Sequence, residues 1–198
     1  LKGKDLIPYT KPDNLLPVDK VVSIIARVAD ALGYAHKQNI VHRDIKPANI
    51  MYEPENDAPK VTDFGIARIT DSSKTKTGMV LGTPSYMSPE QLSGKKVDGR
   101  SDLFSLAVSL YQLLCGALPF VGDSMAQLMF KIANEPATDI LSVRPDLPPA
   151  LVAFLEKAMT KDADQRYQSG DEFAAALRAA YAGGAAPARG GVDMDLGS

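Results

Sequence analysis

One short stretch of the chain, VHRDIKPANIMY over residues 41–52, crowds charged and amide side chains between apolar residues. Asp44 and Asn49 stand five residues apart, and Asp63 follows 14 residues after Asn49. Carboxylate and amide oxygens suit Mg²⁺, a hard cation that keeps water ligands and bridges phosphates. Lys46 adds a positive charge beside them. The set predicts phosphoryl transfer, because that reaction depends on charge neutralisation and alignment more than on a covalent nucleophile.

Each of these residues also has an ordinary structural interpretation. Asp63, which precedes Phe-Gly, could be a turn residue, and Asn49 could cap a turn. Met51 and Phe64, judged singly, are typical core side chains. Only the order and spacing of the whole set favour a functional site.

The hydrophobic pattern around this stretch predicts a small β element next to a long helix. Apolar residues at spacings of three and four predict an amphipathic helix over residues 18–38. Residues 49–53 and 59–64 are short and rich in β-branched and apolar types, and the turn-forming PENDAP between them predicts a hairpin. Residues 39–42 have a similar composition. Residues 1–17 are predicted as loop with one short helical turn.

The second half of the chain is predicted to be helical. A long polar loop at residues 66–98 comes first, and a loop of that length is usually functional. Helices are predicted over four segments: residues 98–116, 123–135, 148–162 and 169–182. The first is apolar nearly all round and ends at Gly116, which predicts a buried central helix. Asp123 is the predicted N-cap of the second helix, and Ser169 and Glu172 have capping-box spacing in the last.

Composition is that of an ordinary globular domain. The 198 residues are 45% hydrophobic and 23% charged with a net charge of −2, so no nucleic-acid partner is expected. No apolar run is long enough to span a bilayer. Cys115 is the single cysteine, which excludes an internal disulfide, fits a reducing compartment and is typical of a core thiol. We predict one domain over residues 1–182 and a flexible tail or linker over residues 183–198.

Several motifs in order resemble those of protein kinases. HRDIKPAN at residues 42–49 matches the kinase catalytic loop, DFG begins at Asp63, and SPE at residues 88–90 stands where the family has A-P-E. With GTPSYMSPEQL, GRSDLFSLAVSLYQLLCGALPF and DQRYQS, the chain resembles the C-terminal lobe of a eukaryotic-like (Hanks-type) bacterial Ser/Thr protein kinase. The resemblance implies a mainly α fold with a small β element, a catalytic loop at residues 42–49 and an activation segment at residues 63–90.

The resemblance implies roles for the polar residues of the first motif. Asp44 would accept the proton of the substrate hydroxyl or orient it. Lys46 would contact the γ-phosphate of ATP, the co-substrate, and a lysine here marks Ser/Thr rather than Tyr kinases. Asn49 and Asp63 would hold Mg²⁺ or Mn²⁺, with Asp63 also near the nucleotide. Met51 would lie beneath the adenine ring.

The resemblance also implies residues that support the site. His42 and Phe64 would pack in an internal hydrophobic column. Asp102 would brace the backbone of the catalytic loop. Glu90 would pair with Arg166 and join the end of the activation segment to the last helices.

The long polar loop is predicted to be a switch. Arg43, directly before Asp44, implies control by phosphorylation, and Thr75 or Thr77 is the predicted acceptor whose phosphate would pair with Arg43. The alternative is a loop that is Ser/Thr-rich because it is solvated. Thr83 would hydrogen-bond Asp44 and the loop lysine and favour a hydroxyl amino acid as acceptor.

The nucleotide-binding half of a kinase is not recognisable before residue 41, since no G-x-G-x-x-G loop with a strand lysine and a helix glutamate is present there. We therefore expect an N-terminal lobe to be absent and these residues alone to be inactive. An exposed lobe interface would favour self-association. The expected partners are proteins with Ser or Thr acceptors, met in the cytoplasm, whether or not the parent is membrane-anchored. The alternative is a one-lobed pseudokinase-like scaffold or binding module, against which the intact Asp44, Lys46, Asn49 and Asp63 argue.

Overall fold

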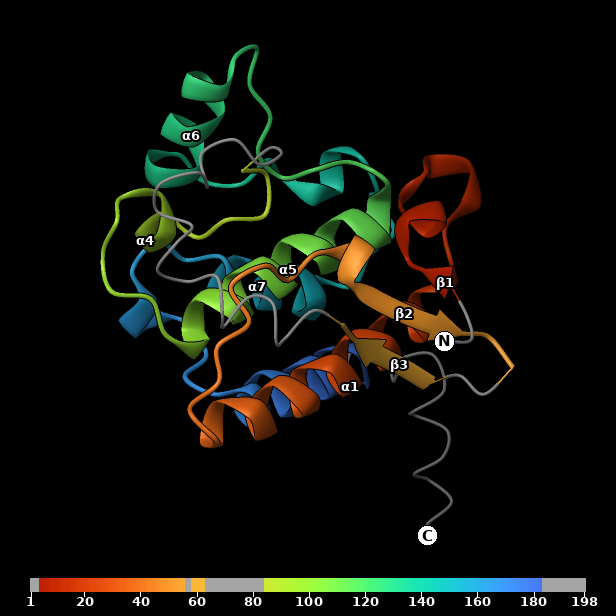
Figure 1. The fold of residues 1–198 in the computed structure, drawn as a ribbon. Helices are drawn as coiled ribbons and strands as arrows, with labels where there is room; N and C mark the ends of the chain where they lie inside the picture. The colour runs from red at the N-terminus through yellow and green to blue at the C-terminus, as the bar shows by residue number, and fades with distance from the viewer. Residues whose placement is uncertain (1–3, 56–57, 63–83, 183–198) are drawn as a thin grey trace, which may run out of the picture.

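The fold is a set of helices packed around one central helix, with a small sheet at one side (Figure 1). The computed structural model describes residues 4–55, 58–62 and 84–182. Helix α5 (Gly99–Cys115) runs through the middle, and α1 (Val18–Lys37) packs along it. The predicted class, mainly α with a small β element, is confirmed.

Helix α5 is buried along nearly its whole length because it carries apolar or small residues on every face. Its N-terminus is capped by Asp98, whose carboxylate accepts from the Arg100 backbone N–H at 2.9 Å. Its C-terminus is closed by Gly116 in the left-handed conformation, with φ of 80°. The central helix predicted over residues 98–116 is confirmed.

Helix α1 is amphipathic, as its apolar spacing predicted. Helix α1 contacts α5, and the helix over residues 170–182 runs beside it (Figure 1). The two helices approach closely where Gly170 meets Gly33: a Cβ on Gly170 would lie 2.6 Å from the Gly33 nitrogen. Only glycine permits this approach.

Within the described part of the chain, the sheet has three antiparallel strands in the order β1-β2-β3, which are Lys4–Asp5, Ile50–Glu53 and Ala58–Val61. The predicted hairpin is confirmed as β2 and β3, with Met51 opposite Lys60. Strand β1 was not predicted, because two residues are too few to show a period of two. Residues 39–42, whose composition suggested a strand, form no strand.

The remaining helices are short. They are η1 (Ile7–Thr10), η2 (Pro12–Asn14), η3 (Pro47–Asn49), α4 (Pro89–Leu92), α6 (Met125–Asn134), η5 (Ile140–Ser142), α7 (Pro149–Ala158) and η6 (Ala163–Gln165). Asp123 is not the N-cap of α6; Ser124 is, because its hydroxyl accepts from the Gln127 N–H at 3.1 Å. Ser169 accepts from the Glu172 N–H as predicted, but the Glu172 carboxylate accepts from the backbone N–H of Gln168, one residue before the expected donor.

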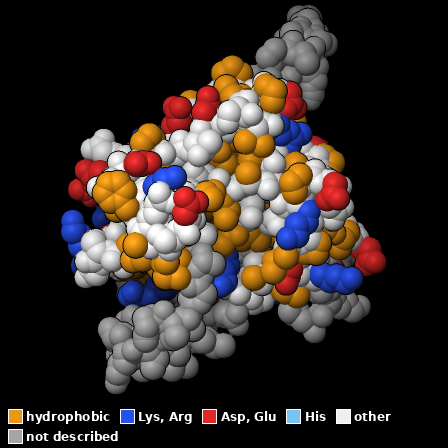
Figure 2. All heavy atoms as spheres, turned by 90° about the horizontal axis from the view of Figure 1, so that it is seen from above, with side chains coloured by type: hydrophobic (Ala, Val, Ile, Leu, Met, Phe, Trp, Pro, Cys, Tyr) orange, Lys and Arg blue, Asp and Glu red, His pale blue; other side chains and the backbone are white. Residues whose placement is uncertain are grey.

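The surface that includes α6 exposes apolar side chains. Figure 2 views the molecule from the top of Figure 1, and hydrophobic side chains gather there among charged ones. Val121, Met125 and Phe130 on and before α6 are 60%, 53% and 57% exposed. Among the described residues, no helix combines the length and the apolar character that crossing a membrane requires.

Candidate active site

The segment over residues 42–49 lies between α1 and β2, and only its last three residues, η3, form regular structure. Side chains from other elements must therefore position the rest of it. Asp102, in the first turn of α5, supplies the main constraint. Its two carboxylate oxygens accept from the backbone N–H groups of His42 and Arg43, both at 2.8 Å. Asp102 is only 1% exposed, so these hydrogen bonds form where water does not compete.

Arg43 adopts a backbone conformation that costs energy. Its φ is 74°, in the left-handed region that non-glycine residues rarely enter. Such a conformation costs about 1–3 kcal/mol and persists only where surrounding contacts impose it. The Asp102 carboxylate holds the Arg43 N–H, and the Gln91 side-chain amide donates to the Arg43 carbonyl at 3.0 Å.

Two residues that support the loop, His36 and Gln91, were missed in the sequence analysis. His36, in the last turn of α1, places Nε2 2.9 Å from Asp102 Oδ2. Gln91 belongs to the capping box of α4, where its side chain accepts from the Ser88 N–H while Ser88 caps the helix. The Ser88–Gln91 spacing is a readable capping signal. By contrast, no local pattern links His36 to Asp102 across 66 residues.

His42 connects the loop to the hairpin. It is fully buried, and its Nε2 lies 2.6 Å from the Thr62 carbonyl while its Nδ1 accepts from the Asp44 N–H at 3.1 Å. These partners assign the proton to Nε2. Thr62 is held further by the Asn49 carbonyl, which accepts from the Thr62 N–H at 2.9 Å. The end of the described hairpin is therefore bonded to the loop at both His42 and Asn49.

Asp44, Lys46 and Asn49 converge on one short loop. Lys46 Nζ lies 3.7 Å from Asp44 Oδ1. The Asn49 side-chain N–H donates to the Asp44 carbonyl at 2.7 Å and lies 3.3 Å from Asp44 Oδ2. Asn49 is buried, whereas the Asp44 and Lys46 side chains are 59% and 37% exposed. The buried Asn49 amide thus holds Asp44, while the Asp44 and Lys46 side chains remain exposed to a ligand.

Met51 lies in β2 on the face opposite the core. Burial alternates along the strand, so Ile50 and Tyr52 point inward while Met51 and Glu53 are only half-buried. Met51 therefore offers an apolar surface beside the loop, with Asp5 and Lys60 as its strand neighbours.

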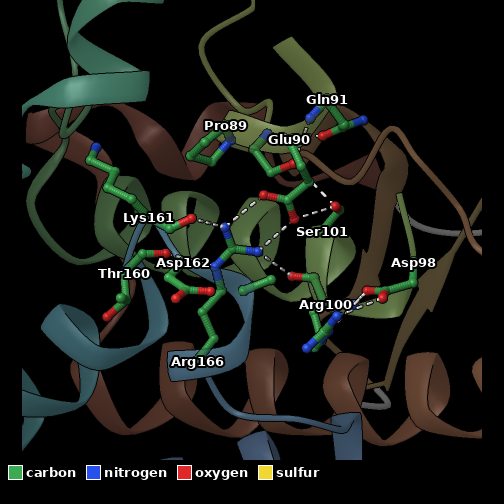
Figure 3. Close-up of polar contacts among 12 residues, drawn as sticks. Pro89, Glu90, Gln91, Asp98, Arg100, Ser101, Thr160, Lys161, Asp162 and Arg166 are labelled. Carbon is green, nitrogen blue, oxygen red and sulfur yellow. Dashed lines mark hydrogen bonds and ion pairs between the residues drawn. The ribbon is translucent and has the colours of Figure 1, made fainter. Parts of the chain in front are cut away.

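Glu90 and Arg166 form a buried ion pair (Figure 3). Arg166 NH1 and NH2 donate to the two Glu90 oxygens at 2.7 and 2.8 Å, and Ser101 Oγ donates to Glu90 Oε2 at 2.6 Å. Burial by itself would raise the pKa of Glu90, but the hydrogen bonds from Arg166 and Ser101 outweigh it and hold the pKa below its usual value. The pair therefore stays charged at neutral pH and joins α4 to the segment before the last helix.

Several predicted site residues lie outside the described residues. They are Asp63, Phe64, Thr75, Thr77 and Thr83. The structure brings together the others in two groups: Asp44, Lys46 and Asn49 on the loop braced by Asp102, and Glu90 with Arg166.

The proteins that this chain resembles in sequence and in structure are protein kinases. The sequence model of the protein kinase domain matches residues 1–181. The serine/threonine-protein kinase pkn3 of Myxococcus xanthus is 42% identical over 187 residues, which is 89% of this chain and 34% of that protein. PknB of Mycolicibacterium smegmatis is 42% identical over 178 residues, 88% of this chain and 28% of that protein. The chain thus spans about a third or less of these relatives. The crystal structure of the Mycobacterium tuberculosis PknI kinase domain superposes with a TM-score of 0.70 at 31% identity, over 91% of this chain and 63% of that one.

Proposed function

Because this chain belongs to the protein kinase domain family, we propose that the protein carrying it transfers the γ-phosphoryl group of ATP to Ser or Thr hydroxyls of protein substrates. The relatives named above are serine/threonine-protein kinases. Lys46, two residues after Asp44, is the residue type that the resemblance associates with Ser/Thr acceptors.

The convergence of Asp44, Lys46 and Asn49 on one braced loop carries the proposal. The exposed Asp44 carboxylate would orient the acceptor hydroxyl and take its proton as the oxygen attacks the γ-phosphorus. The bond from that phosphorus to the bridging oxygen breaks, and ADP leaves. Lys46 would offset the negative charge on the transferring group.

Asn49 has the chemistry of a magnesium ligand here. Its side-chain N–H is used by Asp44, so the amide oxygen is the atom left for a metal. We assign Asn49, with Asp63, to a bound Mg²⁺ or Mn²⁺, which would neutralise phosphate charge. Met51, apolar and facing away from the core, would support the adenine ring.

Regulation is proposed to act through Arg43. The Gln91 amide bonds the Arg43 carbonyl, so the chain after the activation segment already contacts the catalytic loop. A phosphate on Thr75 or Thr77 would add charge pairing with the Arg43 side chain. Thr83 would complete the contacts to Asp44.

We also propose where partners bind. The exposed apolar residues Met125 and Phe130 make α6 a docking surface for protein substrates. We propose that these 198 residues, tested without the rest of the parent protein, transfer no phosphate, because residues 1–40 contain no glycine-rich phosphate loop, and that they self-associate. The cytoplasm, which supplies ATP and suits a chain with one cysteine, is the proposed location.

A Mg-ATP phosphorylation assay on the full-length parent tests the proposal. Asp44→Asn keeps the shape of the side chain but removes its basicity, so we expect turnover to fall about 10²- to 10⁴-fold. Asp171→Asn is the matched control, because Asp171 pairs with Lys37 at the surface, 57% exposed. Equal activity of wild type and Asp44→Asn would exclude the assigned role. A wild-type parent that transfers no phosphate would favour the scaffold.

A further inference from the structure

A second concave site lies outside the candidate active site. It is a cavity of about 430 Å³ between the end of α6, the segment over residues 136–140 and α7. Its walls are mostly apolar: Tyr111, Ala137, Ile140, Val152, Leu155 and Met159. None of its lining residues belongs to the catalytic loop or to the sheet. Its size and apolar lining are those of a small-molecule site.

Some charged side chains at the edge of the cavity already have hydrogen-bond partners, and others can still contact a ligand. Lys161 is committed, because Nζ donates to the Ile132 carbonyl at 2.6 Å and lies 3.3 Å from the Lys131 carbonyl. The same ammonium lies 4.2 Å from the centre of the Phe120 ring. Lys161 therefore caps the end of α6 and is poorly placed to meet an anion.

The acidic side chains at the edge of the cavity, Asp139 and Glu156, can still contact a ligand. Asp139 caps η5 through Oδ1, which accepts from the Leu141 N–H at 3.1 Å, and this leaves Oδ2. Glu156, on α7, is exposed at the same cavity. Among the described residues, two carboxylates thus border the apolar cavity, and the one cation in its lining, Lys161, is already engaged. Charge complementarity then favours a positively charged ligand with an apolar body.

We propose that this cavity binds small apolar amines, with the hydrocarbon part against Ile140, Val152 and Leu155 and the protonated nitrogen at Asp139 and Glu156. The site stands apart from the proposed kinase chemistry and does not depend on it. Binding there would join the end of α6 to α7, the two elements between which the cavity opens.

Three ligands with one apolar body test the proposal by isothermal titration calorimetry on the chain: 4-phenylbutylamine, 4-phenylbutanol and 4-phenylbutyrate. We expect the amine to bind most tightly and the carboxylate about tenfold or more weakly, because the sign of the charge beside the two carboxylates is reversed. The amine's advantage should shrink in 0.5 M salt, since the rim is partly exposed.

Two variants separate the pocket from general surface binding. Val152→Phe fills the cavity and should abolish binding of the amine, whereas Val143→Phe, at an exposed valine outside the cavity, should not. Asp139→Asn keeps the capping ability but removes the charge, so it should lower amine affinity several-fold while Asp146→Asn, outside the cavity, leaves it unchanged.

Three outcomes would overturn the proposal. They are equal affinity for amine and carboxylate, undiminished amine binding by Val152→Phe in a protein with wild-type circular dichroism, and no binding of the amine at millimolar concentration.

Discussion

Removing the Arg166 side chain should destabilise the fold more than any exposed charge change. All three guanidinium nitrogens of Arg166 are occupied: Nε donates to the Thr160 carbonyl, NH1 to Glu90 and Arg100, and NH2 to Glu90 and Lys161. Its side chain is 0% exposed and that of Glu90 is 12% exposed. Arg166→Ala would leave a nearly buried carboxylate without a counter-charge.

The expected magnitude follows from that geometry. Removing one partner of a buried ion pair costs about 3–5 kcal/mol. In a chain of this length, each kcal/mol lowers Tm by roughly 2–4 °C, so the midpoint should fall by about 6–20 °C. Urea unfolding followed by circular dichroism measures the free-energy loss, and thermal melts give the shift in Tm.

Arg178→Ala is the matched control. Arg178 pairs with Asp30 at 2.8 Å, but the two side chains are 49% and 47% exposed. Exposed pairs contribute about 0–1 kcal/mol, so this variant should melt within a few degrees of wild type. If Arg166→Ala lost no more stability than Arg178→Ala, the argument from the buried pair would be wrong.

The pH dependence of stability gives an independent readout. In wild type the pKa of Glu90 is lowered, so its contribution is present above its unfolded value of about 4.5 and is lost as pH falls through the folded value. In Arg166→Ala the burial of Glu90 remains without its main partner, so the pKa should rise. Acidification below neutrality should then narrow the gap between this variant and Glu90→Gln in the same background. A gap that is constant from pH 7 to pH 4 would contradict this assignment.

Three further perturbations have defined outcomes. Gly116→Ala should lower the free energy of unfolding by about 1–2 kcal/mol for its left-handed backbone, and by more because the new Cβ would lie 2.9 Å from Pro12. Gly94→Ala, with φ of 71° and open space around it, should show the backbone cost alone when both are measured by urea unfolding. Burial lowers the pKa of Lys161 from 10.5 to about 8, so between these pH values the folded chain binds fewer protons than the unfolded chain. The stability of wild type relative to a Lys161→Met variant should therefore rise with pH over this range, and a stability difference that does not change with pH would contradict the assignment. Phe130→Ser, at an exposed position on α6, should raise KM for a protein substrate of the parent kinase without changing Tm or turnover of a short peptide, and equal effects on both substrates would argue against docking there.

Much of the helical architecture could be predicted from the sequence because its signals are local. The central helix over 98–116 follows from its nearly continuous apolar character and its terminal glycine. Helix α1 follows from apolar residues spaced three and four apart. Capping was less certain, since Ser124 and its neighbour Asp123 are both good N-caps and only the backbone path selects between them. Strand β1 is two residues long and depends wholly on its partner β2.

The chemistry of the candidate site was also readable in part, since Asp44, Lys46 and Asn49 lie within six residues of one another. A resemblance, not spacing, implied that Asp102 supports this loop and that Glu90 pairs with Arg166. The contacts of His36 with Asp102 and of Gln91 with Arg43 join residues that are 66 and 48 positions apart in the sequence. No local sequence pattern in either segment predicts which residue its partner is.

The sequence by itself determined where the long helices lie and which side chains could transfer a phosphoryl group, because periodicity, capping and residue chemistry act over a few residues. It did not reveal the four-residue helix α4, which lies within residues 66–98 that were predicted as loop. Only the tertiary structure decided that the Asp102 carboxylate holds Arg43 in a left-handed conformation and that Arg166 is completely enclosed. The physical reason is that desolvation and hydrogen-bond geometry depend on groups that packing, not the chain order, brings together.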